Sequence, residues 1–387
     1  MKQNVNNRTD SSFWLKNCPA TNFPKLEKGL KVDVAILGGG IAGITTAKLL
    51  KDAGNTVAVI ESDRIVKDVT VGTTAKITMG TYNVLLSNLG KIKAQAIANA
   101  NIKAFHKMVE IIKNNNINCE LHRLPLYIYT ESQEKANETL DEFKAAKQLG
   151  LPVSYIGEVP LPFETGPAIK YDNQAQFHPR KYLLALSMEI PGEGSYVFEK
   201  TRANNIIIGE NKEVITDQGS IMADKVVVAT HNPVFDPDKL KNHLSPARSY
   251  VIGLYSNEEF PDGMFVDIET AHTYRTTPTD EGNLILVAGE HSPLNVDDRN
   301  VYYCRLENYA RQHLNVESIK YHWSNYDYIT DDGLPLIGMT SVEGVYVATG
   351  FGFWGMTTGT LSAMVISDLI MGKENQFAEL FDPLRFQ

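Results

Sequence analysis

A glycine turn between a predicted strand and a predicted helix is the part of this sequence best suited to chemistry. The turn holds Gly38, Gly40 and Gly43, between an apolar run at 32–37 and a helix-like run at 44–50. Gly38 permits a tight turn, Gly40 lets the backbone approach a pyrophosphate, and Gly43 lets the helix pack close to the strand. The helix N-terminus adds unpaired N–H groups that attract an anion. The pattern predicts a turn that binds a dinucleotide.

A carboxylate stands where the ribose of that dinucleotide would lie. The second predicted strand, 56–60, ends at Glu61. An acid at this position accepts hydrogen bonds from a ribose 2′-OH and repels a 2′-phosphate. An ordinary glycine turn is the alternative interpretation. It is disfavoured because strand, glycines, helix, strand and acid follow one another in the order that a nucleotide-binding unit requires.

Length and composition narrow the function classes. The 387 residues suffice for two domains with cores of their own. The chain is 43% hydrophobic and 21% charged, as globular proteins are, and its formal net charge is -9 at pH 7. A negative net charge without a basic patch argues against binding to nucleic acid or to anionic membranes.

The cysteines indicate neither disulfides nor a metal site. Cys18, Cys119 and Cys304 lie far apart and form no CxxC or CxH spacing. The N-terminus is polar and lacks the apolar segment of a secretory signal, and the apolar runs are too short to span a membrane. We therefore expect a cytoplasmic protein with reduced thiols, no bound metal and no membrane partner.

The elements that must position the glycine turn are spread along the chain. Two continuous β-branched runs, 225–230 and 344–349, are typical of strands in a parallel sheet, and we expect them to join the sheet begun at residue 32. Residues 248–290 hold strand candidates separated by turn residues and predict a separate antiparallel sheet. Aromatic residues within 1–30 predict an arm that docks on the folded body.

Several motifs, taken together, resemble one family. Besides the glycine turn they are the hydroxyl-rich segment 73–76, the segment 328–338 around Asp331-Asp332-Gly333, and the glycine-rich loop 350–359. The chain resembles the glycine oxidase and D-amino-acid oxidase superfamily of flavoproteins, closest to the branch often fused to a Rieske iron–sulfur domain. It departs from that branch because it has no CxH and CxxH spacing, so a relay to a built-in cluster is not expected.

The resemblance implies an α/β fold, with a Rossmann-like FAD-binding domain and an interleaved antiparallel β (α+β) substrate domain. The FAD-binding domain would be discontinuous, comprising 1–118, 177–245 and 322–387, with the arm at 1–30 included. The substrate domain would comprise 119–176 and 246–321 and would roof the flavin.

The resemblance further implies one FAD. We expect it to be non-covalent, because no cysteine follows Cys304 and the segment 73–76 holds no histidine. The loop 350–359 would direct the positive end of a following helix at the flavin and stabilise its reduced anion, although a glycine turn that only closes a domain is the alternative. The residues expected to contact FAD are Gly38, Gly40, Ile41, Ala42, Gly43, Glu61, Ser62, Thr73, Thr74, Ala75, Ala203, Thr230, Gly350, Phe353, Trp354, Gly355, Met356 and Thr357.

Three side chains are candidates for catalysis. Lys76 could place positive charge beside the flavin, with a solvated lysine as the alternative. Tyr274 and Arg275 stand where the family often fixes a substrate carboxylate, and arginine offers a bidentate fork, with an exposed surface arginine as the alternative.

His178 precedes Pro179 and predicts a helix cap. Ordinary polar or core roles are predicted for the histidines without ligand spacing, which are His231, His272, His291 and His322.

The expected function is FAD-dependent oxidation of a small amine or amino acid at its C–N bond. Hydride leaves the α-carbon for flavin N5 once the two are about 3–3.5 Å apart, so the chemistry needs no paired carboxylates or Ser–His–Asp set. Electrons would then pass to dioxygen or to a separate carrier. Two alternatives stay open: a flavin dehydrogenase that serves a ferredoxin or Rieske-type partner, and a non-catalytic flavin-binding redox sensor.

Overall fold

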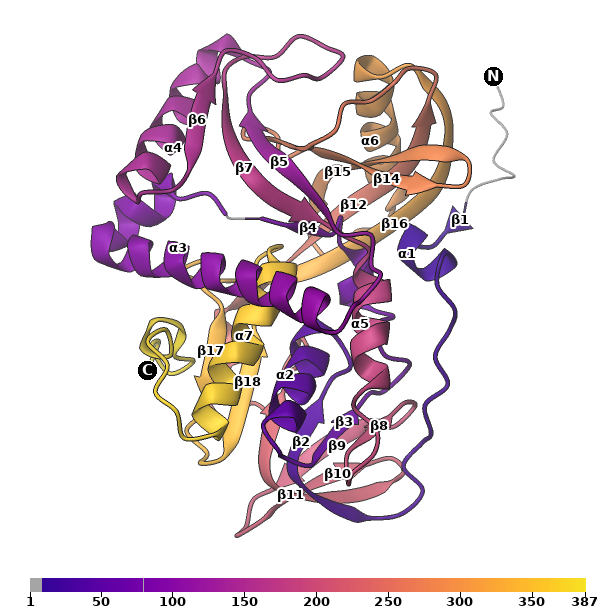
Figure 1. Cartoon of the computed structure of the whole chain (residues 1–387), viewed down its shortest axis with the longest axis vertical. Helices are drawn as coiled ribbons and strands as arrows, with labels where there is room; N and C mark the ends of the chain where they lie inside the picture. The colour runs from indigo at the N-terminus through magenta and orange to yellow at the C-terminus, as the bar shows by residue number, and fades with distance from the viewer. Residues whose placement is uncertain (1–8, 79) are drawn as a thin grey trace.

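The structure is a computed structural model that describes residues 9–78 and 80–387. Its strands form two sheets, drawn in the lower and upper halves of Figure 1. The lower, 8-stranded sheet has the order β17-β18-β11-β2-β3-β8, with β10 and β9 attached through β11. The bounds are β2 Leu30–Leu37, β3 Val57–Ile60, β8 Tyr196–Phe198, β9 Ala203–Ile207, β10 Lys212–Thr216, β11 Gly219–Val228, β17 Leu336–Met339 and β18 Val345–Thr349.

The centre of the lower sheet is parallel and buried. β11 pairs in parallel with β2 and with β18, which confirms that both β-branched runs return to the first sheet. The helices α2 (Ile41–Asp52), α5 (Pro179–Met188) and α7 (Gly355–Ile370) cover one face, with α2 between the other two (Figure 1). Strands covered in this way need apolar side chains on both faces, as the fully buried β3 and β18 show. The predicted α/β, Rossmann-like class is confirmed.

The upper, 10-stranded sheet is mainly antiparallel, in the order β1-β16-β12-β15-β14-β13-β5-β7-β4, with β6 paired to β7. Helix α6 (Asn300–His313) packs on β12 and β15, and α4 (Ala136–Gln148) packs on β6 and β7 beside α3 (Asn83–Asn114). The strand bounds are β1 Thr9–Asp10, β4 Lys76–Ile77, β5 His122–Tyr129, β6 Val153–Ile156, β7 Ala168–Gln176, β12 Leu244–Ser256, β13 Met264–Asp267, β14 Thr273–Thr279, β15 Gly282–Ser292 and β16 Val316–Thr330.

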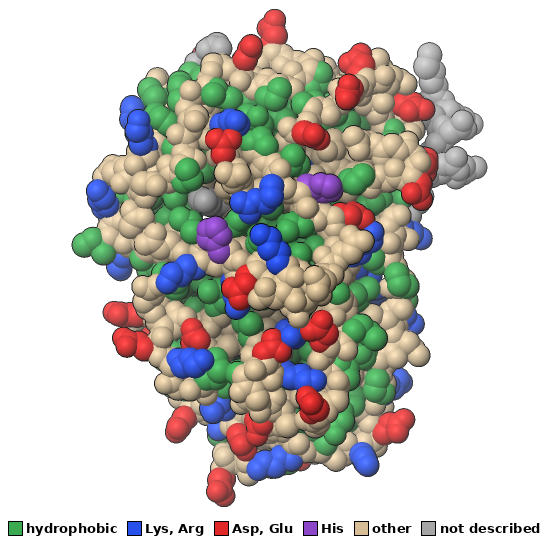
Figure 2. All heavy atoms as spheres, in the orientation of Figure 1, with side chains coloured by type: hydrophobic (Ala, Val, Ile, Leu, Met, Phe, Trp, Pro, Cys, Tyr) green, Lys and Arg blue, Asp and Glu red, His purple; other side chains and the backbone are tan. Residues whose placement is uncertain are grey.

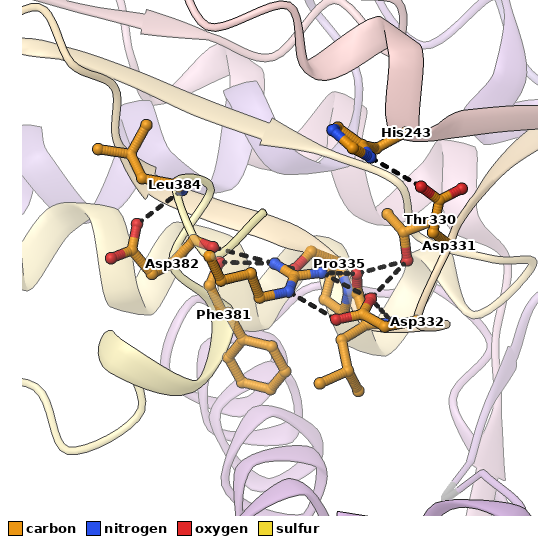
Figure 3. Close-up of polar contacts among 10 residues, drawn as sticks. His243, Thr330, Asp331, Asp332, Pro335, Phe381, Asp382 and Leu384 are labelled. Carbon is orange, nitrogen blue, oxygen red and sulfur yellow. Dashed lines mark hydrogen bonds and ion pairs between the residues drawn. The ribbon is translucent and has the colours of Figure 1, made fainter. Parts of the chain in front are cut away.

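Strand β16 carries the chain from the upper sheet to the lower one. It pairs with β12 as far as Thr330, so the predicted domain boundary at 321/322 falls inside a strand of the upper sheet. The turn that follows is held by Asp332, whose carboxylate accepts N–H groups from Arg385 at 2.7 and 2.8 Å. The hydroxyl of Thr330 donates to the same carboxylate at 3.1 Å, as Figure 3 shows. The motif at 328–338 thus fixes how β16 leads into β17.

The predicted arm docks on the body where it is described. Phe13 and Trp14 of the short helix α1 (Phe13–Lys16) are buried, and the Trp14 indole donates to the Thr73 carbonyl at 2.8 Å. The first eight residues of the predicted arm, and Met79, lie outside the described residues.

Charge on the surface and the apolar character of the helices can be compared with the expectations from composition. Acidic and basic side chains are interspersed on the face that Figure 2 shows. Among residues 9–78 and 80–387, no helix has the length and apolar character needed to cross a bilayer. The same residues contain no group of three or more His, Cys, Asp or Glu side chains placed to hold a metal ion.

Candidate active site

A cavity of about 870 Å³ lies between the two sheets. Its floor is formed by the glycine turn after β2 and by the ends of the neighbouring strands. Its roof is the face of the five strands β12, β13, β14, β15 and β16 that points at the lower sheet. This volume is in the upper part of the range of about 300–1,000 Å³ that is usual for cofactor and small-molecule sites.

The glycine turn fits the cofactor that the sequence predicts. Gly38 has φ +110°, and a Cβ there would stand 2.4 Å from the Ala229 carbonyl oxygen. A Cβ on Gly43 would stand 2.0 Å from the Gly38 oxygen, so Gly43 sets the packing of α2 behind the turn. Gly40 lines the cavity, and a Cβ there would meet the Thr70 hydroxyl at 3.1 Å. Two glycines therefore shape the turn, and the third keeps its surface open to a phosphate.

Glu61 lies at the same end of the cavity with its carboxylate held in place. One oxygen accepts the Gly39 N–H at 2.8 Å, and the other accepts the Asp63 N–H at 2.9 Å. The oxygen that bonds Asp63 also accepts the Ser62 hydroxyl at 3.0 Å. Of the about four lone-pair sites of a carboxylate, the one left lies on the oxygen that bonds Gly39, and it can accept a ribose hydroxyl. The predicted contacts Ser62, Ala203 and Thr230 line this end as well.

The segment 73–76 forms one side wall and is anchored from behind. Ala75 has φ +59°, and its N–H donates to the Thr73 hydroxyl at 2.9 Å. The Arg275 guanidinium donates to the carbonyls of Thr74 at 3.1 Å and Ala75 at 3.0 Å. Thr73, Thr74 and Lys76 line the cavity, whereas Ala75 is buried and lies outside its lining.

Lys76 extends from this segment toward the roof. Its Nζ donates to the Thr74 hydroxyl at 3.1 Å and to the Thr273 hydroxyl at 2.8 Å. Burial, with a smaller effect from the Arg275 cation, lowers the pKa of Lys76 to about 7. The ammonium is therefore easily deprotonated near neutrality, and an anion beside it would favour the charged form.

Arg275 and Tyr274 do not line the cavity. The guanidinium of Arg275 is buried and also bonds the carbonyl of Thr276 at 3.1 Å. Tyr274 faces the opposite side of β14, as alternation along a strand requires, and packs near Phe163 and Phe260. In place of the predicted substrate contact, Arg275 therefore positions the wall that carries Lys76.

The loop before α7 closes the far end of the cavity. Phe353 has φ +68°, and its N–H donates to the Asp327 carboxylate at 2.7 Å. Phe353, Trp354, Gly355 and Met356 line the cavity, as predicted for flavin contacts. Gly350 and Thr357 lie outside the lining, as do the predicted contacts Gly43 and Ala75. A Cβ on Gly350 would meet Thr330, and the Thr357 hydroxyl donates to the Thr78 carbonyl at 3.2 Å.

Asp327, His231 and His291 also line the cavity. No role was predicted for Asp327, and only ordinary polar or core roles were predicted for the two histidines. Burial raises the pKa of Asp327 to about 6 and lowers that of His231 to about 4. The His231 Nδ1 lies 3.8 Å from an Asp327 oxygen. Two signals could have identified these residues. His231 directly follows the predicted contact Thr230, and Asp327 directly precedes the motif at 328–338. The cap prediction for His178 is confirmed, since its Nδ1 accepts the Lys181 N–H at 3.2 Å.

Known proteins match most of this chain. The FAD dependent oxidoreductase family model, DAO, matches residues 33–369. The putative Rieske 2Fe-2S iron-sulfur protein YhfW of Bacillus subtilis (strain 168) is 33% identical over 384 residues, which are 97% of this chain and 75% of that protein. A D-amino acid dehydrogenase of Rhizobium rhizogenes is 31% identical over 178 residues, 42% of this chain and 41% of that protein.

Solved structures share the fold. Glycine oxidase from Geobacillus kaustophilus has a TM-score of 0.73 at 19% identity, covering 92% of this chain and 99% of that one. L-proline dehydrogenase from P. horikoshii has a TM-score of 0.72 at 20% identity, covering 94% and 98%. Identities this low show that the fold is shared and say nothing of the substrate.

Proposed function

Because the chain belongs to the family of FAD-dependent oxidoreductases, we propose that it oxidises the C–N bond of a small amine or amino acid. The observation that carries the proposal is one continuous cavity that joins the glycine turn, the Lys76 wall and the N-terminus of α7 beneath an antiparallel roof. Bound there, FAD supplies the capacity to accept a hydride. The substrate would lie between the flavin and the roof.

Each wall would have its own task. The turn at Gly38–Gly43 binds the pyrophosphate through backbone N–H groups, and Glu61 accepts the ribose hydroxyl. The N-terminus of α7 and the Lys76 ammonium place positive charge where negative charge develops on reduction. The roof excludes water and holds the substrate in line, which is most of what hydride transfer requires.

We also propose that FAD is bound without a covalent link and that the protein is cytoplasmic. Cys18, Cys119 and Cys304 are all free, and none of them lines the cavity. Free thiols are usual in a reducing compartment. Acid precipitation should release all flavin into the supernatant, and flavin that stays with the precipitated chain would contradict a non-covalent site.

An anaerobic panel tests the proposed reaction. The yellow holoprotein is mixed without oxygen with amino acids of both hands, N-methyl amino acids and simple amines. At least one compound should bleach the visible flavin band. If dithionite bleaches the flavin and no panel compound does, the non-catalytic sensor is favoured and the proposal fails.

A dehydrogenase is the second candidate, and a specific observation favours it. The Bacillus subtilis relative, of which this chain covers 75%, is named as a putative Rieske 2Fe-2S iron-sulfur protein, and an iron–sulfur carrier could take the electrons here. Reoxidation of the bleached flavin distinguishes the two acceptors. Fast recovery in air indicates an oxidase, whereas slow recovery in air with fast recovery by a ferredoxin or Rieske protein indicates a dehydrogenase.

A further inference from the structure

The roof of the cavity carries a single acid. Among the described residues that line it from β12 to β16, Asp327 is the one carboxylate, and no lysine or arginine accompanies it. The remaining roof residues are small, aliphatic or neutral polar, apart from His291. The other acids that line the cavity, Glu61, Asp63 and Asp68, follow β3 at the glycine-turn end.

Asp327 retains unused hydrogen-bonding capacity. One oxygen accepts the Tyr328 N–H at 2.8 Å, and the other accepts the Phe353 N–H at 2.7 Å. A carboxylate offers about four lone-pair sites, so each oxygen can accept one more donor. Since the two backbone bonds fix the plane of the carboxylate, it is preorganised for a ligand that donates N–H groups.

No neighbouring cation balances the charge of Asp327 in the described structure. The nearest basic side chain recorded is His231, at 3.8 Å, whose burial lowers its pKa to about 4 and leaves it neutral at pH 7. The other basic group near the substrate space, Lys76, is bonded to the hydroxyls of Thr74 and Thr273. A buried, unpaired carboxylate is costly and is stabilised by a cationic partner.

We propose that Asp327 binds the amino group of the substrate and makes this cavity prefer an alkylammonium group to a carboxylate at the roof. The inference rests on the proposed function and names the substrate class that this site accepts. An ammonium would donate to Asp327 and neutralise it. A carboxylate placed at the same point would meet a like charge.

Two ligands that share a tert-butyl group and carry opposite charges test this preference without any turnover. tert-Butylamine has no hydrogen on the carbon beside its nitrogen and cannot be oxidised, and pivalate is its carboxylate counterpart. Each is titrated into the holoprotein at pH 8, and its binding is measured by the shift of the flavin spectrum and by calorimetry. tert-Butylamine should bind at least about tenfold tighter than pivalate, as a charge-assisted hydrogen bond provides. Equal binding, or tighter binding of pivalate, overturns the proposal.

The matched variants assign the preference to one side chain. Asp327→Asn should abolish the tenfold preference, and an undiminished preference in this variant also overturns the proposal. Asp331→Asn is the control, because its side chain is half-exposed, bonds His243 and does not line the cavity. Should Asp327→Asn fail to retain FAD, the comparison of the two ligands on the unaltered protein decides alone. If the ammonium preference holds and no panel compound bleaches the flavin, only the proposed reaction fails.

Discussion

The Asp327 carboxylate accepts the Phe353 N–H at 2.7 Å and so joins the last strand of the roof to the loop that begins α7. Phe353 has φ +68°, a backbone conformation that side-chain-bearing residues rarely adopt without support. One side chain therefore orders the wall predicted to meet the flavin and also faces the space left for the substrate. This contact would couple the proposed substrate site to the proposed flavin site.

The binding of an amine ligand should depend on pH with an inflection near 6. Burial raises the pKa of Asp327 to about 6, so the carboxyl is protonated below that pH and ionised above it. The affinity for tert-butylamine should rise about tenfold per pH unit up to pH 6 and level off above it. His231, which faces Asp327 at 3.8 Å, stays neutral in this window because its pKa is about 4. Titrations from pH 5 to 8 check this. Lys76 lines the same cavity and has a pKa of about 7, so Asp327→Asn should lose the inflection near 6 and keep only a change near 7.

Lys76→Met should slow flavin reduction by the best panel substrate about 10²-fold or more, as the loss of one preorganised charge does in other sites. The pKa of Lys76 is lowered to about 7, so the unaltered protein should lose reduction rate as the pH rises through 7. Anaerobic stopped-flow measurements at saturating substrate test both points. Lys76→Arg keeps the charge and should remove the decline above pH 7. A Lys76→Met variant with the original rate and pH profile would contradict the assigned role.

Arg275→Ala should destabilise the protein rather than change its substrate profile. The substitution removes the Arg275 donor from the carbonyls of Thr74, Ala75 and Thr276. Ala75 keeps the Phe177 N–H at 3.4 Å and Thr276 keeps the Gln176 amide at 2.8 Å, so the Thr74 carbonyl is the group left unsatisfied, at about 1–3 kcal/mol. Denaturant unfolding of the apoprotein measures the decrease in the free energy of unfolding. Arg305→Ala, at an exposed position on α6, is the control. Unchanged stability with selective loss of carboxylate substrates would restore the role that the sequence predicted for Arg275.

Gly40→Val should abolish FAD retention while the chain still folds. A Cβ at this position already meets the Thr70 hydroxyl at 3.1 Å, and the branched side chain would occupy the surface that a pyrophosphate must approach. Flavin content after gel filtration measures retention, and circular dichroism reports folding. Gly157→Val, at an exposed glycine where a Cβ meets nothing within 4 Å, should keep its FAD. Normal affinity in Gly40→Val would refute the pyrophosphate assignment.

The parts of the site that sequence predicted are those with local signals. The glycine turn, Glu61 and the strand ending near Thr230 each follow from a short run of residues whose spacing has a direct physical meaning. The loop at Phe353–Met356 was predicted through resemblance, and the structure brings it to the same cavity as the turn.

The parts that sequence could not predict depend on pairing between distant strands. Arg275 meets the carbonyls of Thr74 and Ala75 because β4 pairs with β7 beside the roof, a contact that no local pattern encodes. Asp327 has no such local pattern either. It lies on the roof because β16 stays paired with β12 as far as Thr330, beyond the predicted domain boundary at 321/322.

An anaerobic titration determines whether this chain transfers two electrons from the C–N bond of an amine or amino acid to FAD. The holoprotein is titrated without oxygen with the panel compound that bleaches it fastest, and the carbonyl product left after imine hydrolysis is quantified. One equivalent of compound should bleach one equivalent of FAD and yield one equivalent of carbonyl product. Bleaching without that product, or no bleaching by any panel compound in a protein that dithionite reduces, would contradict it.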